Sequence, residues 1–243
     1  MTRSSIDLSR LPLPADCRDA AAFLNRGCVC SSVDHRRLRK ALESESGDGD
    51  ISHASLLATR PHLFSDTMVF VAEAHLRHMA ELIVAIEKVL VLPAYRERVL
   101  TYAPPIARHQ PKAAGVFLGY DFHLGISGPQ LIEINTNAGG ALLNAKLMRA
   151  QQACCPQLES MFPAQATVES DFVAMFREEW RLARGDKPLA RIAIVDQDPA
   201  TQFLAPEFEL FRQLFESQGI AAVVVDPAEF SFDGDRLSCG GQD

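Results

Sequence analysis

The chain has 243 residues, which is long for one ordinary domain and short for two. Its 24 basic and 31 acidic residues give a formal charge of −7, and this acidity disfavours nucleic acid as a partner because phosphate binding needs a basic surface. Hydrophobic residues make up 47% of the chain, which excludes global disorder and supplies a sizeable core.

The sequence carries no apolar run long enough to cross a membrane, and its first ten residues lack the apolar core of a signal peptide. We therefore expect a cytoplasmic protein with no membrane partner. The six cysteines agree with this, because none has the two-residue spacing of a zinc knuckle or a thioredoxin motif. We expect them to be buried free thiols.

The first part of the chain is predicted to be helical. Its strongest pattern is at residues 67–92, which contain no Gly or Pro and repeat apolar side chains at helical spacing. Ser65 is expected to cap this helix and Pro93 to stop it, with one broad apolar stripe buried. Shorter helices are expected at residues 20–25, 36–43 and 55–58.

The middle of the chain carries its clearest pattern. Alternating apolar residues predict two antiparallel strands, at 115–125 and 129–136, around a three-residue turn that ends at Gly128. Glycines then lead into a helix predicted at 138–152, and a further helix is predicted at 170–184.

That turn sets the register of the two strands. Asp121 should face Glu133 and His123 should face Leu131, with Asn135 on the same side of the hairpin. The other side is apolar and should pack on a core through Val116, Leu118, Tyr120, Phe122, Leu124, Ile132 and Ile134.

From residue 189 strands alternate with helices. Apolar runs at 191–195 and 220–225 predict two buried strands, and an amphipathic helix is predicted between them at 207–218. Together they make one βαβ unit, followed by a hairpin that turns at Asp233 and Gly234. No Gly-x-Gly-x-x-Gly follows the first strand, so nothing supports a dinucleotide site.

Two such strands and a hairpin do not make a complete sheet, because parallel strands are normally covered on both faces. Either upstream residues supply the other strands or the natural protein continues beyond Asp243, and we favour the second. An incomplete sheet leaves an exposed strand edge, which would favour a homo-oligomer.

Two carboxylates that face each other on a hairpin repel unless their charge is compensated. Solvation of an exposed face is one alternative. A divalent cation is the other, because two carboxylates and an amide oxygen suit Mg²⁺ or Mn²⁺, which share oxygen ligands with nucleotide phosphates.

Residues 131–140 read Leu-Ile-Glu-Ile-Asn-Thr-Asn-Ala-Gly-Gly, and Asp121 precedes them. This pattern resembles the metal-binding end of ATP-grasp ligases such as D-alanine–D-alanine ligase and bacterial glutathione synthetase. In that family an Asp, a Glu and an Asn ligate the Mg²⁺ ions bound to ATP, so the resemblance implies that Asp121, Glu133 and Asn135 are metal ligands. Ala138 departs from the pattern, since many members have Pro there.

The loop after Asn135 is a second candidate site. It enters the next helix, whose N-terminal backbone N–H groups suit a phosphate or a carboxylate, and a flexible turn is the alternative. Lys146 and Arg149, three residues apart on that helix, are expected to be solvated charges, and a role as phosphate ligands is the alternative. The residues that would contact the cofactor are Thr136, Asn137, Gly139 and Gly140.

The order of the parts is similar to that of circularly permuted ATP-grasp proteins, the glutathionylspermidine synthase-like group, in which Glu-x-Asn precedes the α/β unit. The fold class is therefore expected to be α+β or α/β. It would consist of a helical region at 1–110, a metal-binding hairpin with its helix at 111–165, and an incomplete pre-ATP-grasp-like unit at 166–243.

The resemblance implies an ATP-dependent ligase that phosphorylates a small carboxylate with MgATP and lets an amine or a thiol attack the acylphosphate. His123, on the same face as the three metal ligands, would either support one of those ligands or have only a packing role. No segment supplies a clamp for the nucleotide, so we expect residues 1–243 alone to be inactive and a longer form to be active. The alternative is a non-catalytic ligand- or metal-binding domain that retains the fold.

Overall fold

The computed structural model describes residues 15–27, 33–43, 56, 58–125, 127–151, 168–234 and 236–240. These residues form a mixed α and β structure, as the sequence predicts. Contacts divide the chain into two compact units: unit 1 holds the described parts of 1–32 and 66–138, and unit 2 those of 33–65, 139–152 and 163–243. The three regions predicted at 1–110, 111–165 and 166–243 were defined by sequence motifs, whereas these units are defined by contacts. The division into those three regions therefore stays a prediction.

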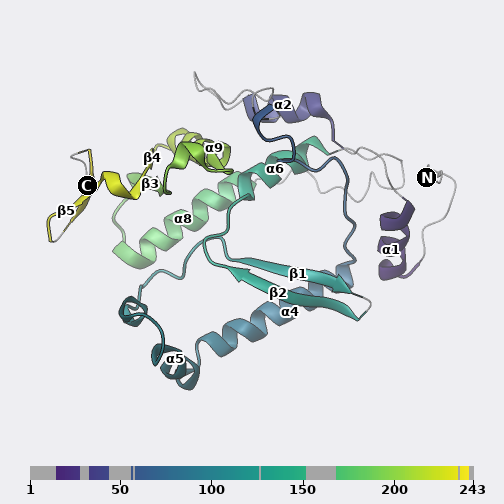
Figure 1. Ribbon diagram of the computed structural model, residues 1–243, viewed down its shortest axis with the longest axis horizontal. Coiled ribbons are helices and arrows are strands. Elements are labelled where there is room, and N and C mark those ends of the chain that lie inside the picture. The colour runs from purple at the N-terminus through teal and green to yellow at the C-terminus, as the bar shows by residue number, and fades with distance from the viewer. Residues whose placement is uncertain are drawn as a thin grey trace. The chain divides into compact units, whose positions relative to one another are not determined.

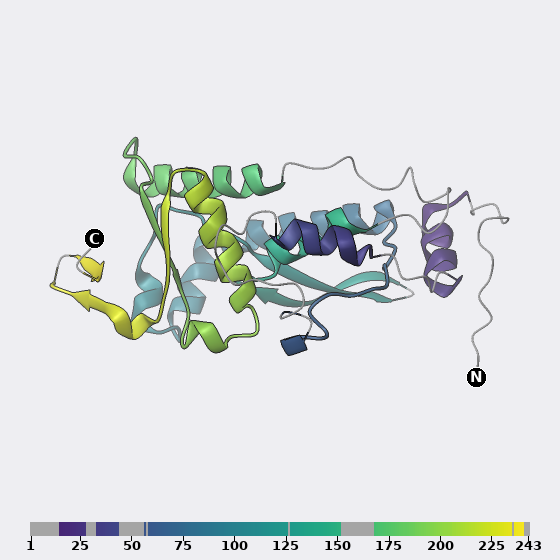
Figure 2. The same ribbon diagram turned by 90° about the horizontal axis from the view of Figure 1, so that it is seen from above.

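Unit 1 contains the predicted hairpin. In both views the hairpin lies along a helix, α4 (Figures 1 and 2). The Asn25 side chain ties the first helix to the backbone of Phe70 through two hydrogen bonds of 2.8 Å. The elements of unit 1 are α1 (Cys17–Gly27), α4 (Glu73–Leu90), α5 (Pro93–Leu100), the 3₁₀ turn η2 (Pro105–Arg108), β1 (Gly119–Gly125) and β2 (Gly128–Asn135).

Helix α4 is shorter and less buried than predicted. It begins at Glu73 with Ala72 rather than Ser65 as its N-cap, and it ends at Leu90. Pro93 opens α5, a position where its missing N–H has no cost. No residue of α4 is fully buried, and its apolar residues Met79, Leu82, Ile83 and Ile86 are half-buried.

Unit 2 holds the main apolar core. Helices and strands throughout the unit supply it, and an aromatic cluster of Phe172, Phe176, Phe211 and Phe215 extends it, with ring centroids 5.0 to 6.3 Å apart. Its elements are α2 (His35–Glu43), α6 (Ala141–Ala150), α8 (Val168–Arg184), β3 (Arg191–Val195), η3 (Pro199–Thr201), α9 (Ala205–Ser217), β4 (Ala221–Val225), η4 (Pro227–Glu229), β5 (Phe230–Phe232) and β6 (Leu237–Cys239). These bounds confirm the helices predicted at 36–43, 138–152, 170–184 and 207–218, and α1 confirms the one at 20–25.

The predicted βαβ unit is present, but its strands are less buried than predicted: no residue of β3 is fully buried, and in β4 only Ala222 and Val225 are. Strands β3 and β4 pair in parallel, and α9 packs against them (Figure 2). A glycine cap ends α9: Gly219 has φ +75°, and the N–H groups of Gly219 and Ile220 donate to the carbonyls of Glu216 and Phe215. Among the described residues no third strand joins this pair. The short hairpin β5–β6 follows, as predicted.

The two cysteines that the structure describes are less buried than predicted. Cys17 is a free thiol that is exposed rather than buried, and Cys239 is free and half-buried. The other four cysteines and most of the helix predicted at 55–58 lie outside the described residues. In the part of the chain that the structure describes, no helix has the length and apolarity that a membrane crossing requires.

Candidate functional site

The hairpin places the three predicted ligands on one face. Asp121 lies directly opposite Glu133 in the antiparallel ladder, and Asn135 pairs with Gly119 two residues further along. The Nδ2 atom of Asn135 lies 3.5 Å from Oδ2 of Asp121. Both carboxylates are exposed, and Asn135 is half-buried. The predicted register is therefore confirmed at the end of the hairpin that carries the ligands.

The turn end of the hairpin differs from the prediction. Gly125 pairs with Gly128, so the strands are connected by two residues rather than three. His123 consequently faces Gln130 rather than Leu131, the partner that we predicted. An extra residue in β2, Ile132, then forms a bulge that returns the ladder to the predicted register before the ligand pair. The shorter connection shifts the register by one residue, and the bulge at Ile132 shifts it back by one residue.

The apolar face of the hairpin is less buried than predicted. Leu118, Leu124, Ile132 and Ile134 are each at least 36% exposed, and the other predicted members are half-buried. Full burial is found instead at Gly128 and Pro129, because α4 meets the hairpin near its turn, where His78 lies beside Gly128. The prediction that this face packs on a core is wrong for the residues that the structure describes.

Two carboxylates and one amide make up the candidate metal set. Elsewhere in the described ranges, as at the hairpin itself, no three His, Cys, Asp or Glu side chains gather as a metal site would require. A cation here would therefore depend on the Asn135 amide and on water or phosphate oxygens. His123 lies two residues from Asp121 on the same side of β1, and its supporting role stays a prediction.

The loop after β2 is tied to the segment before β1. The Ala138 N–H donates to the Phe117 carbonyl at 2.6 Å. Phe117 and Asn137 have φ values of +48° and +59°, which residues other than glycine rarely adopt. Gly119 fits beside this bond because it lacks a side chain: a Cβ there would lie 2.9 Å from the Ala138 Cβ. The backbone around Asn135 is therefore closely specified.

The hydrogen bond from the Ala138 N–H to Phe117 explains why residue 138 is alanine rather than the proline of the pattern that the sequence resembles, because proline has no N–H to donate. We expect Ala138→Pro to destabilise the hairpin by about 2 kcal/mol, because proline removes the donor to Phe117 and restricts Asn137 to extended conformations. Amide hydrogen exchange of β1 and β2 measures the loss. Ala138→Ser keeps the N–H and should exchange like the wild type, whereas equal protection in the proline variant would contradict the prediction.

The N–H groups at the start of α6 are not free, contrary to the prediction. Glu207, in the first turn of α9, accepts hydrogen bonds from the Gly140 N–H and, at 2.8 Å, from the Leu142 N–H. Its side chain is fully enclosed, since the residue is 2% exposed. An internal carboxylate therefore occupies the position that we predicted for a phosphate or a ligand carboxylate.

The four predicted cofactor residues lie on both sides of the division between the units. Thr136 and Asn137 belong to the end of unit 1 and are exposed. Gly139 and Gly140 open unit 2, where Gly140, with φ +97°, is the N-cap of α6. Their contact with a nucleotide stays a prediction.

Lys146 and Arg149 are not solvated charges, as we had predicted them to be. Lys146 is 1% exposed, and its Nζ lies 3.5 Å from Oε1 of Glu169 in the first turn of α8. Arg149, which is partly buried, forms an ion pair with the other oxygen of Glu169. The signal that we missed is helical spacing, because Lys146 follows the buried Leu142 by four residues and so shares its face.

The carboxyl ends of β3 and β4 are the places where open α/β sheets bind ligands. Asp226, which follows β4, accepts hydrogen bonds of 2.7 Å from the N–H groups of Ala228 and Asp198. These bonds hold the pKa of Asp226 below its usual value. Glu229 completes a capping box by accepting the Asp226 N–H at 2.9 Å. Asp226 thus stabilises the local backbone of η4.

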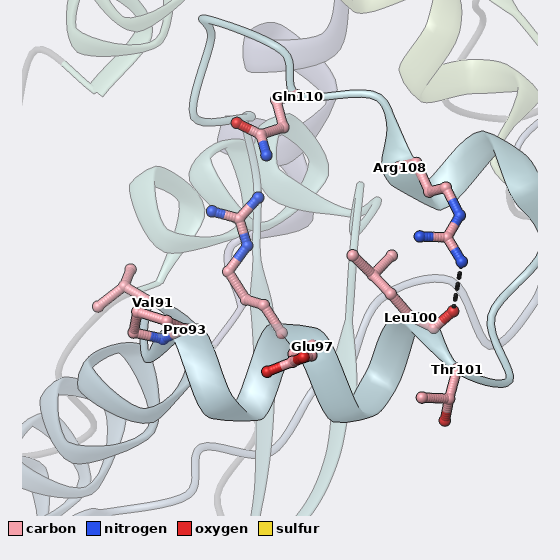
Figure 3. Close-up of a pocket in the computed structure, with 8 residues that line it drawn as sticks. Val91, Pro93, Glu97, Leu100, Thr101, Arg108 and Gln110 are labelled. Carbon is pink, nitrogen blue, oxygen red and sulfur yellow. Dashed lines mark hydrogen bonds between the residues drawn. The ribbon is translucent and has the colours of Figure 1, made fainter.

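A hollow of about 470 Å³ lies beside α5 in unit 1 (Figure 3). At its rim Arg108 donates a hydrogen bond of 3.1 Å to the Leu100 carbonyl, drawn as a dashed line. No motif in the sequence marked these residues as a site. The hollow is lined by Val91, Pro93, Arg96, Glu97, Leu100, Thr101, Arg108 and Gln110.

Comparison of the chain with protein-family models, with curated proteins and with solved structures finds no match. A functional proposal for this chain therefore depends on its own residues and their geometry.

Proposed function

We propose that the β1–β2 hairpin binds Mg²⁺ or Mn²⁺ at the metal-binding end of an ATP-dependent ligase of ATP-grasp type. The observation that carries this proposal is the position of Asp121 directly opposite Glu133, with Asn135 beside them. Carboxylates placed in this way destabilise a hairpin unless a positive charge compensates them. A divalent cation between them would turn the repulsion into an attraction.

The three side chains suit such a cation. Asp121 and Glu133 would supply anionic oxygens. The Asn135 amide now directs its nitrogen towards Asp121, and rotation of the amide by half a turn would present Oδ1 instead. Because Mg²⁺ prefers six oxygens and keeps several waters, the exposed hairpin would leave its remaining positions to water and to nucleotide phosphates.

The reaction proposed for the whole ligase has two steps. A substrate carboxylate attacks the γ-phosphorus of ATP, so that an acylphosphate forms and ADP leaves. An amine or a thiol then attacks the acyl carbon, and inorganic phosphate leaves. Metal ions held by the hairpin would neutralise charge on the transferred phosphoryl group and orient it.

One observation favours a second candidate, a metal-binding domain without catalysis. The start of α6, which would suit a phosphate, is already occupied by the carboxylate of Glu207. A domain that binds a cation without binding the triphosphate agrees with this arrangement.

Titration of the chain with Mn²⁺, followed by electron paramagnetic resonance with and without ATP, tests the proposal. We expect one saturable Mn²⁺ site whose affinity rises roughly tenfold with ATP, because the two ligands share oxygen atoms. An ADP-release assay with carboxylic acids and amines then tests catalysis. Mn²⁺ binding that ATP leaves unchanged would favour the second candidate, and the absence of a saturable site would refute both.

A further inference from the structure

The hollow beside α5 is lined by two arginine side chains from different elements. Arg96 lies on α5 and Arg108 ends the turn η2, and the polar side chains of Thr101 and Gln110 line the same space (Figure 3). All of the lining residues lie between positions 91 and 110, within unit 1. The hollow is therefore built from one short stretch of the chain.

The end of α5 and the turn after it shape the hollow. The Ala103 N–H donates to the Val99 carbonyl at 3.0 Å, so the chain turns tightly as it leaves the helix. Pro104 then adopts an extended backbone and leads into η2. This path returns Arg108 to the end of α5, where it donates to the Leu100 carbonyl, one of the last carbonyls that have no partner within a helix.

Both guanidinium groups keep donors that a ligand could use. Arg108 uses Nη2 for its bond of 3.1 Å to Leu100, which holds the group in place, while its Nε and Nη1 bond to no residue that the structure describes. The Arg96 side chain forms no hydrogen bond or ion pair with any residue in the described ranges. Glu97 also lines the hollow, but adjacent residues of a helix do not face each other.

The local charge is opposite in sign to that of the whole chain. The segment at 93–112 has four basic side chains and one acidic side chain, a net charge of +3, whereas the whole chain carries −7. A guanidinium presents paired N–H groups in one plane, which match the two oxygens of a carboxylate or of a phosphate. The basic side chains are Arg96, Arg98, Arg108 and Lys112, and the acidic one is Glu97. The hollow therefore favours an anion.

The remaining lining of the hollow is apolar. Val91, Pro93 and Leu100 contribute to it, and Val91 is 71% exposed. A ligand with a hydrocarbon part would cover this surface, which is favourable. The volume of about 470 Å³ is also in the range of small-molecule sites rather than that of a single inorganic ion. These features point to an organic anion.

We propose that this hollow binds a small organic anion, whose carboxylate or phosphate group bonds to Arg96 and Arg108 and whose hydrocarbon part lies on the apolar lining. Thr101 and Gln110 would add neutral hydrogen bonds. The proposal is independent of the proposed metal function, because no predicted metal ligand lines the hollow.

Titration of the full chain with butyrate, followed by NMR of the arginine Nε–Hε groups, tests the proposal. We expect saturable shifts at Arg96 and Arg108. Butyrate should bind about fivefold more tightly than acetate, because its two additional methylene groups contact the apolar lining. Titrations with butyl phosphate and with inorganic phosphate show which anionic group the hollow prefers. The absence of a saturable shift with all four anions would overturn the proposal.

Two arginines of α5 provide a variant and its matched control. Arg96→Gln should weaken binding of the preferred anion about tenfold, because a charge-assisted hydrogen bond is lost. Arg98→Gln removes the same charge from the same helix, but Arg98 does not line the hollow, so its affinity should stay within twofold of the wild type. Both residues are exposed, so neither change should prevent folding. Equal weakening in the two variants would overturn the proposal, since the anion would then respond only to the overall charge of the surface.

Discussion

Replacement of either hairpin carboxylate should weaken Mn²⁺ binding on the order of 100-fold, which is about 2.7 kcal/mol. Asp121→Asn and Glu133→Gln each remove one negative charge from a site that has two. Two unit charges 4 Å apart near a protein surface interact by about 4 kcal/mol, and a dication in direct contact interacts more strongly. The loss should therefore exceed that of any neutral ligand, and Mn²⁺ titration of each variant measures it.

An exposed carboxylate elsewhere in the same unit provides the control. Glu97→Gln removes the same charge on α5, from a residue outside the ligand set, and should leave Mn²⁺ affinity unchanged. Without metal, the two hairpin variants should be more stable than the wild type by about 0.5 kcal/mol, since the repulsion is relieved. Unchanged Mn²⁺ affinity in both variants would show that the carboxylates form a solvated face.

Loss of the Glu169 charge should destabilise unit 2 by about 3 kcal/mol. Glu169 is the carboxylate between Lys146 and Arg149, and Lys146 is almost completely buried. Glu169→Gln removes the negative charge that lies 3.5 Å from the buried ammonium, and weaker charge compensation of a buried ammonium is strongly unfavourable. Urea denaturation followed by the fluorescence of Trp180, the one tryptophan of the chain, reports on this unit.

The matched control lies on the same helix. Glu178 pairs with Arg181 on α8, but both side chains are more than half exposed, so Glu178→Gln should change stability little. The double variant Glu169→Gln with Lys146→Met should recover part of the loss, because an apolar side chain replaces the buried charge. If Glu169→Gln were no more destabilising than Glu178→Gln, the network around Lys146 would contribute nothing to folding.

Local patterns in the sequence determined the elements themselves. Helical spacing of apolar residues predicted α9. Period-two alternation around Gly128 predicted the hairpin, whereas the pairing of Asp121 with Glu133 was derived from a three-residue turn and is correct only because the bulge at Ile132 cancels the shorter connection. These predictions succeed because each depends on residues within a few positions of one another, where backbone geometry converts spacing directly into direction.

Burial and long-range bonds were decided only by the tertiary structure. The apolar stripe of α4 is only half-buried, and Lys146 is buried because Glu169 supplies its charge. The start of α6 is occupied by Glu207, a residue 67 positions beyond Gly140 in the sequence. No periodicity within one segment specifies which distant side chain will meet it, so partners of this kind appear only when the elements pack together.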